Sequence, residues 1–171
     1  MIETRLDLFD NLRPGAVCIE VGTFAGAFAL EIKKAFPHVN LACVDNWAPP
    51  HFDKLRVIAL ANLRGVVTII DKSSVEAAAS LPREIADVIY IDGAHDQKSV
   101  AADLDAWWPV LKPGGLFSGH DYFMRPAPGG DLAFWGPVEV PLAVDPWAKA
   151  QGLIITTTTV DNPPSWFVRK S

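Results

Sequence analysis

One stretch near the N-terminus, residues 17–26, constrains the fold more than any other part of the chain. Its hydrophobic run from Val17 to Val21, which includes one carboxylate, is typical of a central parallel strand covered on both faces. Gly22 follows and can adopt backbone angles closed to other residues, so a ligand can approach the main chain there. Residues 27–36 then repeat apolar side chains at helical spacing. The stretch predicts a strand, a turn and a helix start at the ligand-binding edge of an open α/β sheet.

The spacing of the glycines in this turn indicates which ligands fit. A dinucleotide fingerprint requires G-x-G-x-x-G, and its second glycine lies against the pyrophosphate. Counted from Gly22, Phe24 takes that second position and Ala27 takes the third. Because a phenyl ring would obstruct the pyrophosphate, we expect neither NAD nor FAD to bind.

Composition and charge exclude several classes of protein. The 171 residues are enough for one domain with a sizeable core, which we expect to span residues 1–171. The formal net charge is −5 without a basic run, which argues against nucleic acid or an anionic membrane as partner. We find no membrane-spanning apolar segment and no signal-peptide pattern, and therefore expect a cytoplasmic protein. Cys18 and Cys43 fall in predicted strands and should be reduced core thiols.

Strands and helices alternate along the chain. After a short amphipathic helix within residues 1–13, strands are predicted at 17–21, 39–45, 66–70, 86–92 and 116–120. The helices between them are predicted at 27–36, 51–63, 73–81 and 98–111, and Ser73 with Glu76 forms a capping box. A long mobile loop at 122–136 precedes a helix within 138–151 and strands at 153–160 and 165–170. This order predicts a Rossmann-like, doubly wound, seven-stranded α/β sheet.

Several motifs, in order, resemble those of one family. Glu20-x-Gly22-x-x-x-Gly26 is followed by Ile91-Asp92-Gly93-Ala94-His95, Val100-x-x-Asp103-Leu104-x-x-Trp107, Leu111-Lys112-Pro113-Gly114-Gly115 and Gly119-His120-Asp121-Tyr122. This set is similar to small bacterial class I methyltransferases, which include macrolide and aminocoumarin sugar O-methyltransferases and cephalosporin-hydroxylase-like proteins. The resemblance implies S-adenosylmethionine as cofactor and a sheet that is mostly parallel with an antiparallel last strand.

The resemblance also implies where the cofactor binds, with Glu20 holding its cationic amino group. Asp45 follows the glycine turn at about the 20-residue spacing of a carboxylate that binds ribose hydroxyls, or else it only caps the turn at Asn46. Ser73 stands where the family usually has an acidic residue near the adenine, but a helix cap explains it equally well. We expect Asp103 and Asp105 to be solvated and Trp107 to be core. The predicted cofactor-binding residues are Glu20, Gly22, Thr23, Phe24, Gly26, Asp45, Asn46, Ser73, Ser74, Asp92 and Gly93.

Acid and imidazole side chains should converge beside the methyl group of the cofactor. Asp92 ends the fourth strand and His120-Asp121 ends the fifth, so all three reach the same edge of a parallel sheet. In the sugar O-methyltransferases that the chain resembles, the matching positions are carboxylates that hold Mg²⁺. His120 replaces one of them, and imidazole suits Zn²⁺, Fe²⁺ or Ni²⁺ better than Mg²⁺. The predicted divalent-metal ligands are Asp92, His120 and Asp121, and a polar cluster without metal is the alternative.

The predicted catalytic residues are His95, His120 and Asp92, with the two histidines as candidate bases. We expect a methyltransferase that acts on a hydroxyl group of a sugar or another small molecule. A catalytically silent S-adenosylmethionine-binding domain and a hydroxylase-like reaction on the same fold remain open. The chain has almost none of the N-terminal segments that shape the acceptor pocket in larger enzymes of the family. Recognition of the acceptor should come from residues 47–52, from residues 122–135, or from another subunit of a homo-oligomer.

Overall fold

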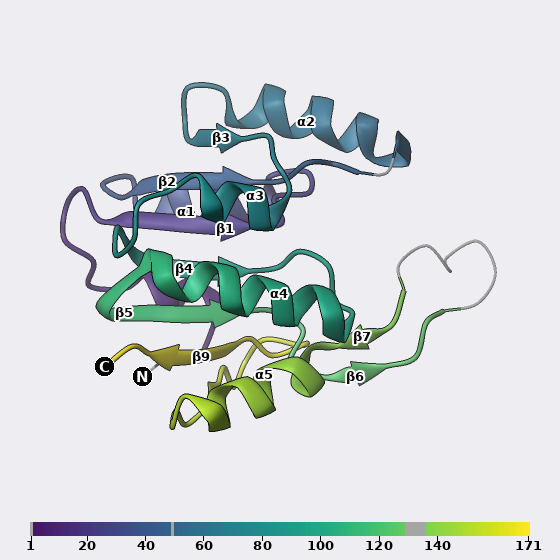
Figure 1. Cartoon of the computed structure of the whole chain (residues 1–171). Coiled ribbons are helices and arrows are strands. Elements are labelled where there is room, and N and C mark those ends of the chain that lie inside the picture. Colours follow the sequence, from purple (N-terminus) through teal and green to yellow (C-terminus); the bar gives the residue numbers. More distant parts are fainter. Residues whose placement is uncertain (1, 49, 129–135) are drawn as a thin grey trace.

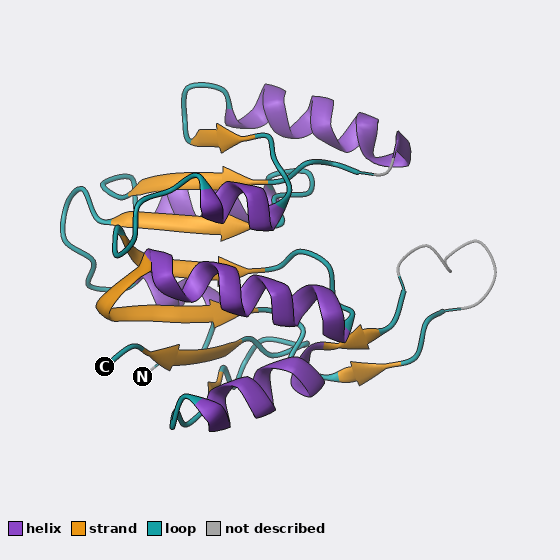
Figure 2. Cartoon of the chain, in the orientation of Figure 1, coloured by secondary structure: helices purple, strands orange, loops and turns teal. Residues whose placement is uncertain are grey.

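The computed structural model of the chain describes residues 2–48, 50–128 and 136–171. At its centre lies a seven-stranded sheet with the strand order β3-β2-β1-β4-β5-β9-β8 (Figures 1 and 2). Strands β1 to β5 are parallel, and β9 lies antiparallel between β5 and β8. This arrangement confirms the predicted sheet. The strands are β1 (Val17–Val21), β2 (Asn40–Val44), β3 (Thr68–Ile70), β4 (Ala86–Ile91), β5 (Leu111–Gly119), β8 (Thr156–Thr157) and β9 (Trp166–Arg169).

Helices cover both faces of the sheet (Figure 1). One face packs against η1, α1 and α2, and the other packs against α3, α4 and α5. Parallel strands covered in this way must be apolar on both faces, which explains the hydrophobic runs in β1 and β4. The helices are η1 (Arg5–Phe9), α1 (Ala27–Ala35), η2 (Pro50–Phe52), α2 (Asp53–Leu63), α3 (Ser74–Ala79), α4 (Gln97–Trp107), η3 (Trp108–Val110) and α5 (Val140–Ala150).

Alternation along β1 divides the core into two layers. Cys18 packs with Phe28 and Ile32 of α1, whereas Ile19 packs with Leu104 and Trp107 of α4 on the opposite face. Both cysteines are buried and free, as predicted. Burial raises the pKa of the Cys18 thiol to about 12, so this side chain is an inert part of the core.

Three predicted elements differ from those observed. The N-terminal helix is a single 3-10 turn, in which Leu8 and Phe9 are the buried residues. Strand β5 begins at Leu111 and not at residue 116, because residues 112–115 form an irregularity between the paired Leu111 and Leu116 and do not end the strand. Only Thr156 and Thr157 of the predicted strand 153–160 pair with β9, since β-branched residues form a strand only where a partner strand lies alongside.

A second, two-stranded sheet was not predicted. It pairs β6 (Met124–Arg125) antiparallel with β7 (Val138–Glu139), inside the region predicted as one long loop and the start of a helix. Residues 129–135 of that predicted mobile loop lie outside the described residues. None of the helices in the described part of the chain is both long and apolar enough to cross a membrane.

Candidate active site

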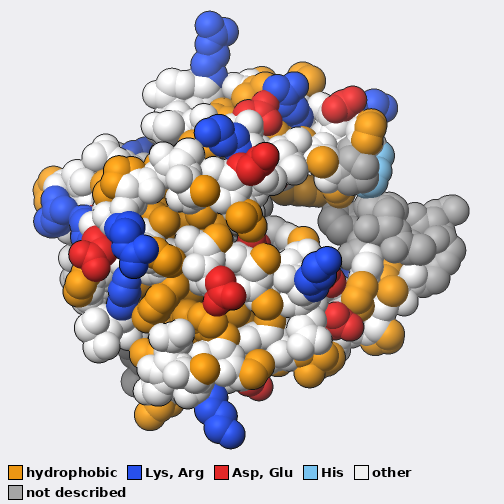
Figure 3. All heavy atoms as spheres, in the orientation of Figure 1, with side chains coloured by type: hydrophobic (Ala, Val, Ile, Leu, Met, Phe, Trp, Pro, Cys, Tyr) orange, Lys and Arg blue, Asp and Glu red, His pale blue; other side chains and the backbone are white. Residues whose placement is uncertain are grey.

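A cavity of about 860 Å³ opens at the carboxyl ends of the parallel strands. In Figure 3 the surface is hollowed at the side toward which these strands point in Figure 1. The turns after β1, β2 and β4 and the start of α3 form its walls. Ten of the predicted cofactor-binding residues line it, namely Glu20, Gly22, Thr23, Phe24, Asp45, Asn46, Ser73, Ser74, Asp92 and Gly93.

Gly22 brings the ends of β1 and β4 into contact. Its φ angle is +94°, and a Cβ atom at this position would lie 2.0 Å from the carbonyl oxygen of Asp92. No side chain fits there, so the backbone itself forms the floor of the cavity. Gly26, the remaining predicted residue, is not among the lining residues. A Cβ atom on Gly26 would lie 2.9 Å from the Leu63 side chain, so this glycine allows α1 to pack closely against α2.

Asp45 fixes the two loops on either side of the cavity mouth. Its Oδ2 atom accepts a hydrogen bond from Phe24 N, and its Oδ1 atom accepts one from Trp47 N, both at 2.8 Å. Trp47 Nε1 in turn donates to the carbonyl oxygen of Phe24 at 2.7 Å. Both aromatic residues have positive φ angles, 51° and 46°, which is uncommon outside glycine. Backbone held in this state concentrates at functional sites. Asp45 therefore has the turn-capping role, and its carboxylate also faces the cavity.

Glu20 has one side-chain oxygen without a partner among the described residues. This oxygen is Oε2, and the side chain that carries it is 2% exposed. Burial raises the pKa of Glu20 to about 8, and the negative charge of Asp92 adds to the shift. A buried acceptor of this kind is costly unless a donor reaches it, so the site is prepared for a cationic or N–H-bearing ligand.

Four acid and imidazole side chains, which we call the acid–imidazole cluster, meet beside this cavity: Asp92, His95, His120 and Asp121. His95 Nε2 lies 2.8 Å from Asp121 Oδ2 and 3.6 Å from Asp92 Oδ1. His120 Nδ1 lies 3.3 Å from Asp121 Oδ2 and 3.8 Å from Asp92 Oδ1. The predicted convergence of the fourth and fifth strand ends thus brings in His95 as well, from the loop after β4.

Within this cluster, Asp92, His95 and Asp121 have the geometry of a cation site. One ligand atom from each lies within 4.8 Å of the others. The short His95–Asp121 approach lacks hydrogen-bond alignment, so buried His95 Nε2 has no partner among the described residues. Burial opposes the charge on His95, but Asp121 and Asp92 outweigh burial and raise its pKa to about 9. Asp121 has a left-handed backbone, with φ of 53°, and a pKa held well below its usual range by both histidines against the effect of burial.

Asp103 of α4 is buried, although the sequence analysis predicts that it is solvated. It is 5% exposed, lines the cavity, and accepts a hydrogen bond from Ser74 Oγ, which itself accepts one from Trp107 Nε1 at 2.8 Å. Burial raises the pKa of Asp103 to about 6. The signal was present in the sequence, because residues 100, 103, 104 and 107 share one helical stripe. Asp105 is exposed and Trp107 is core, as predicted.

Ser73 caps α3. Together with Glu76 it forms the predicted capping box, and its hydroxyl donates to the Glu76 carboxylate at 2.5 Å. Ser73 also lines the cavity, so the cap does not exclude contact with a ligand.

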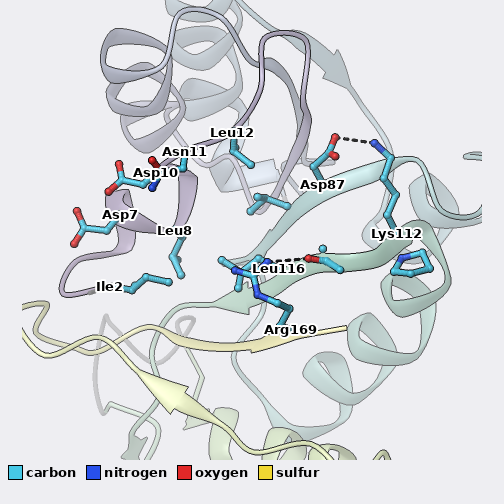
Figure 4. Close-up of a pocket in the computed structure, with 14 residues that line it drawn as sticks. Ile2, Asp7, Leu8, Asp10, Asn11, Leu12, Asp87, Lys112, Leu116 and Arg169 are labelled. Carbon is cyan, nitrogen blue, oxygen red and sulfur yellow. Dashed lines mark hydrogen bonds and ion pairs between the residues drawn. The ribbon is translucent and has the colours of Figure 1, made fainter. Parts of the chain in front are cut away.

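A second cavity, of about 510 Å³, lies at the opposite edge of the sheet, between η1 and the start of β5 (Figure 4). Its charged groups pair with one another and with the backbone. Lys112 Nζ lies 2.8 Å from Asp87 Oδ2, and Arg169 Nη1 donates to the carbonyl oxygen of Gly114 at 2.8 Å. None of the predicted site residues lines this cavity. The contacts around this cavity join the ends of β4, β5 and β9, and we assign the residues that make them a structural role.

Comparison with known proteins identifies the family. A family model described as a methyltransferase domain matches residues 19–122, which include the glycine turn, Asp92 and the end of β5. The chain belongs to this methyltransferase family. It is a class I S-adenosylmethionine-dependent methyltransferase, as the ordered motifs indicated. Comparison with curated proteins finds none that matches.

Solved structures share the fold of this methyltransferase at low sequence identity. A putative caffeoyl-CoA O-methyltransferase from Staphylococcus aureus has 17% identity and a TM-score of 0.67, over 91% of this chain and 76% of that one. A SAM-dependent methyltransferase from Aquifex aeolicus has 18% identity and a TM-score of 0.63, over 96% and 90%. A geranyl diphosphate methyltransferase in complex with geranyl diphosphate and sinefungin has 8% identity and a TM-score of 0.70, over 97% and 75%.

The cavity of the methyltransferase fits its cofactor. The Oε2 atom of Glu20, which has no partner among the described residues, suits the ammonium group. The bare backbone at Gly22 allows close approach, and the Asp45 carboxylate suits ribose hydroxyls. When bound, S-adenosylmethionine supplies a sulfonium whose methyl group can pass to a nucleophile.

Asp45→Ala should weaken the binding of S-adenosylhomocysteine by about 1–3 kcal/mol, because a charged hydrogen-bond acceptor is lost from the cavity. Calorimetric titration measures the affinity, and chemical denaturation measures the stability of the same variant. Asp45→Asn is the matched control, since its single side-chain oxygen keeps one of the two hydrogen bonds from the Trp47 and Phe24 amides while the charge is lost. If Asp45→Ala loses stability while its affinity is unchanged, Asp45 is only a turn-capping residue.

Binding of S-adenosylhomocysteine at pH 7 should release about one proton from Glu20. Without ligand the pKa of Glu20, about 8, keeps the carboxyl mostly protonated at this pH, and a neighbouring ammonium favours the carboxylate. Calorimetry in two buffers of different ionisation enthalpy counts the protons released. Glu20→Gln should abolish the release and weaken binding, and an unchanged proton count in this variant would assign the release to another group.

The buried Asp103 carboxyl should make stability depend on pH. Its pKa is about 6 when folded, against an ordinary value of 3.8. The folded chain therefore holds this proton more tightly, and the free energy of unfolding should fall by about 2–3 kcal/mol as pH rises from about 4 to above 6. Asp103→Asn keeps an oxygen for Ser74 and should lose this pH dependence, whereas the exposed Asp105→Asn should keep it. Parallel profiles for wild type and Asp103→Asn, from denaturation at pH 4 and pH 7, would contradict the assignment.

Proposed function

We propose that this methyltransferase is an O-methyltransferase of a hydroxylated small molecule, and that a divalent cation held by Asp92, His95 and Asp121 assists the reaction. The observation that carries the proposal is the close approach of these three ligand atoms, within 4.8 Å, beside the cofactor cavity that Asp92 and His95 also line. The Staphylococcus aureus structural neighbour is itself named an O-methyltransferase, which supports transfer to oxygen.

The donor set fits a transition metal better than magnesium. The set of two carboxylates and one imidazole includes a nitrogen ligand, which suits Zn²⁺, Fe²⁺ or Ni²⁺, whereas Mg²⁺ prefers oxygen alone. His95 Nε2 lies 2.8 Å from Asp121 Oδ2 without a hydrogen bond among the described residues, which suits a ligand atom beside a second ligand. This set differs from the predicted one, because His95 takes the place of His120. A divalent cation bound there would lower the pKa of a coordinated acceptor hydroxyl.

The protein's own contribution is alignment and proton transfer. Asp92 lines the cavity and Asp121 lies beside it in the acid–imidazole cluster, and fixed carboxylates can orient a hydroxyl group. His120, whose Nδ1 lies 3.3 Å from Asp121 Oδ2, is then the imidazole outside the ligand set that can accept the hydroxyl proton.

The second candidate is a catalytically silent S-adenosylmethionine-binding domain, since the fit of the cavity to the cofactor supports binding without requiring methyl transfer. Turnover of cofactor labelled in the methyl group, with a panel of sugars, phenols and catechols, separates the two functions. Our proposal predicts label transfer to at least one acceptor, loss of transfer after chelation, and recovery with Fe²⁺, Zn²⁺ or Mn²⁺. Tight binding of S-adenosylhomocysteine without transfer to any acceptor would favour the silent domain, and full activity after chelation would overturn the metal.

A further inference from the structure

The N-terminal segment is fixed beside the cofactor cavity, although nothing in its sequence indicates this place. The amides of Thr159 and Val160 both donate to the carbonyl oxygen of Glu3 at 3.0 Å. The amide of Arg5 donates to Asp161 Oδ2 at 2.5 Å. With Leu8 and Phe9 buried below, these contacts hold η1 in one position against the sheet.

Arg5 extends from this segment into the lining of the cavity, next to Glu20 and Phe28. Its guanidinium carbon lies 4.2 Å from the centre of the Phe28 ring, a cation–π contact that fixes the direction of the side chain. Its ion pair with Glu31 is long, 3.6 Å between Nη2 and Oε2, and Glu31 is 55% exposed. A solvent-exposed pair of this kind stabilises little, so the guanidinium keeps donors for a stronger anionic partner.

The charges around Arg5 favour a ligand that carries both signs. Among the described lining residues the acids are Glu20, Asp45, Asp92, Asp96 and Asp103, whereas the cations are Arg5, Lys72 and His95. His95 lies 2.8 Å from Asp121 Oδ2, so its charge is already matched within the acid–imidazole cluster. Lys72 follows β3, two strands away from β1. The positive charge of Arg5 acts instead on Glu20 and His120, at the ends of β1 and β5. Arg5 and Glu20 therefore place one cation and one acid, which a neighbouring ammonium would convert to the carboxylate, at the same end of the cavity.

We infer that Arg5 binds the carboxylate of the methionine part of S-adenosylmethionine, while Glu20 binds its ammonium group. An amino acid zwitterion needs one partner of each sign, and a guanidinium can hold a carboxylate through two parallel hydrogen bonds. Arg5 is thus a cofactor-binding residue supplied by the N-terminal segment, and the inference rests on binding of this cofactor. The same guanidinium could instead bind a carboxylate of the acceptor, which the experiment must separate.

The test compares two ligands that differ only in the carboxylate: S-adenosylhomocysteine and its decarboxylated analogue, S-adenosyl-3-thiopropylamine. In calorimetric titrations, Arg5→Gln should weaken binding of S-adenosylhomocysteine by about 10- to 100-fold and change binding of the amine less than about twofold. Glu31→Gln removes only the long ion pair and should leave both affinities unchanged.

Three results overturn the inference. The affinity for S-adenosylhomocysteine could be unchanged in Arg5→Gln, which would assign Arg5 to the acceptor if the acceptor KM rises. Both ligands could lose affinity equally, which would make Arg5 structural.

If Arg5→Gln does not fold, the same comparison can be made with Arg5→Lys. This variant keeps the aliphatic stem over Phe28 and lacks the forked guanidinium, and equal losses of affinity for the two ligands again overturn the inference. Failure of wild type to bind S-adenosylhomocysteine would contradict the cofactor assignment itself, and the inference with it.

Discussion

Gly22→Ala should abolish binding of S-adenosylhomocysteine and lower the free energy of unfolding by at least about 3 kcal/mol. The added Cβ would lie 2.0 Å from the Asp92 carbonyl oxygen and 2.3 Å from its carbonyl carbon. Both are backbone atoms, so the ends of β1 and β4 would have to separate. The φ of +94° adds the strain that any residue with a side chain meets there.

Gly65→Ala is the matched control for this prediction. Gly65 has φ of +74°, and a Cβ at this position would meet nothing within 4 Å. Gly65→Ala should therefore lower the free energy of unfolding only by the strain of a left-handed backbone, about 1–2 kcal/mol, and leave the affinity for S-adenosylhomocysteine unchanged. Chemical denaturation and calorimetric titration measure both variants. If Gly22→Ala costs no more than Gly65→Ala, the strand ends are not in the close contact that we describe.

The second large effect should come from removal of a cation ligand. Asp121→Asn and His95→Ala should each lower the affinity for a divalent cation and the rate of methyl transfer by at least about 100-fold. His120→Asn should lower transfer while cation affinity stays within about threefold, because this imidazole lies outside the ligand set. Asp105→Asn, an exposed carboxylate on α4, should change neither quantity.

Competition with a chromophoric chelator measures cation affinity independently of activity. Loss of cation binding in His120→Asn with retention in His95→Ala would restore the ligand set predicted from sequence. Absence of cation binding in wild type would leave the acid–imidazole cluster as a metal-free arrangement, with His95 or His120 as the base.

The sheet and the position of the cavity could be predicted because their signals are local. The hydrophobic run at Val17–Val21 and the glycine turn after it fix a strand end, and parallel strands bring all such ends to one edge. The same reasoning placed Asp92 and Asp121 near each other, which the 4.8 Å cluster bears out for these two residues.

The details of the cluster could not be predicted, because they depend on side-chain direction. His95 lies in a loop, and only tertiary packing turns its Nε2 atom toward Asp121. Arg5 reaches the cavity because distant residues 159–161 fix the N-terminal segment, and spacing in the sequence carries no sign of such a contact. Asp103 differs from both. Its position in the helical stripe with Val100, Leu104 and Trp107 indicates burial, whereas its charge led to the wrong prediction that it is solvated.

The most direct test that the carboxyl edge of this sheet binds S-adenosylmethionine is a calorimetric titration of the wild-type chain with S-adenosylhomocysteine and, separately, with NADH. We predict saturable binding of S-adenosylhomocysteine at one site per chain and no binding of NADH, because Phe24 occupies the position where a pyrophosphate would lie. Saturable binding of NADH that S-adenosylhomocysteine displaces, or no binding of S-adenosylhomocysteine at all, would contradict this assignment.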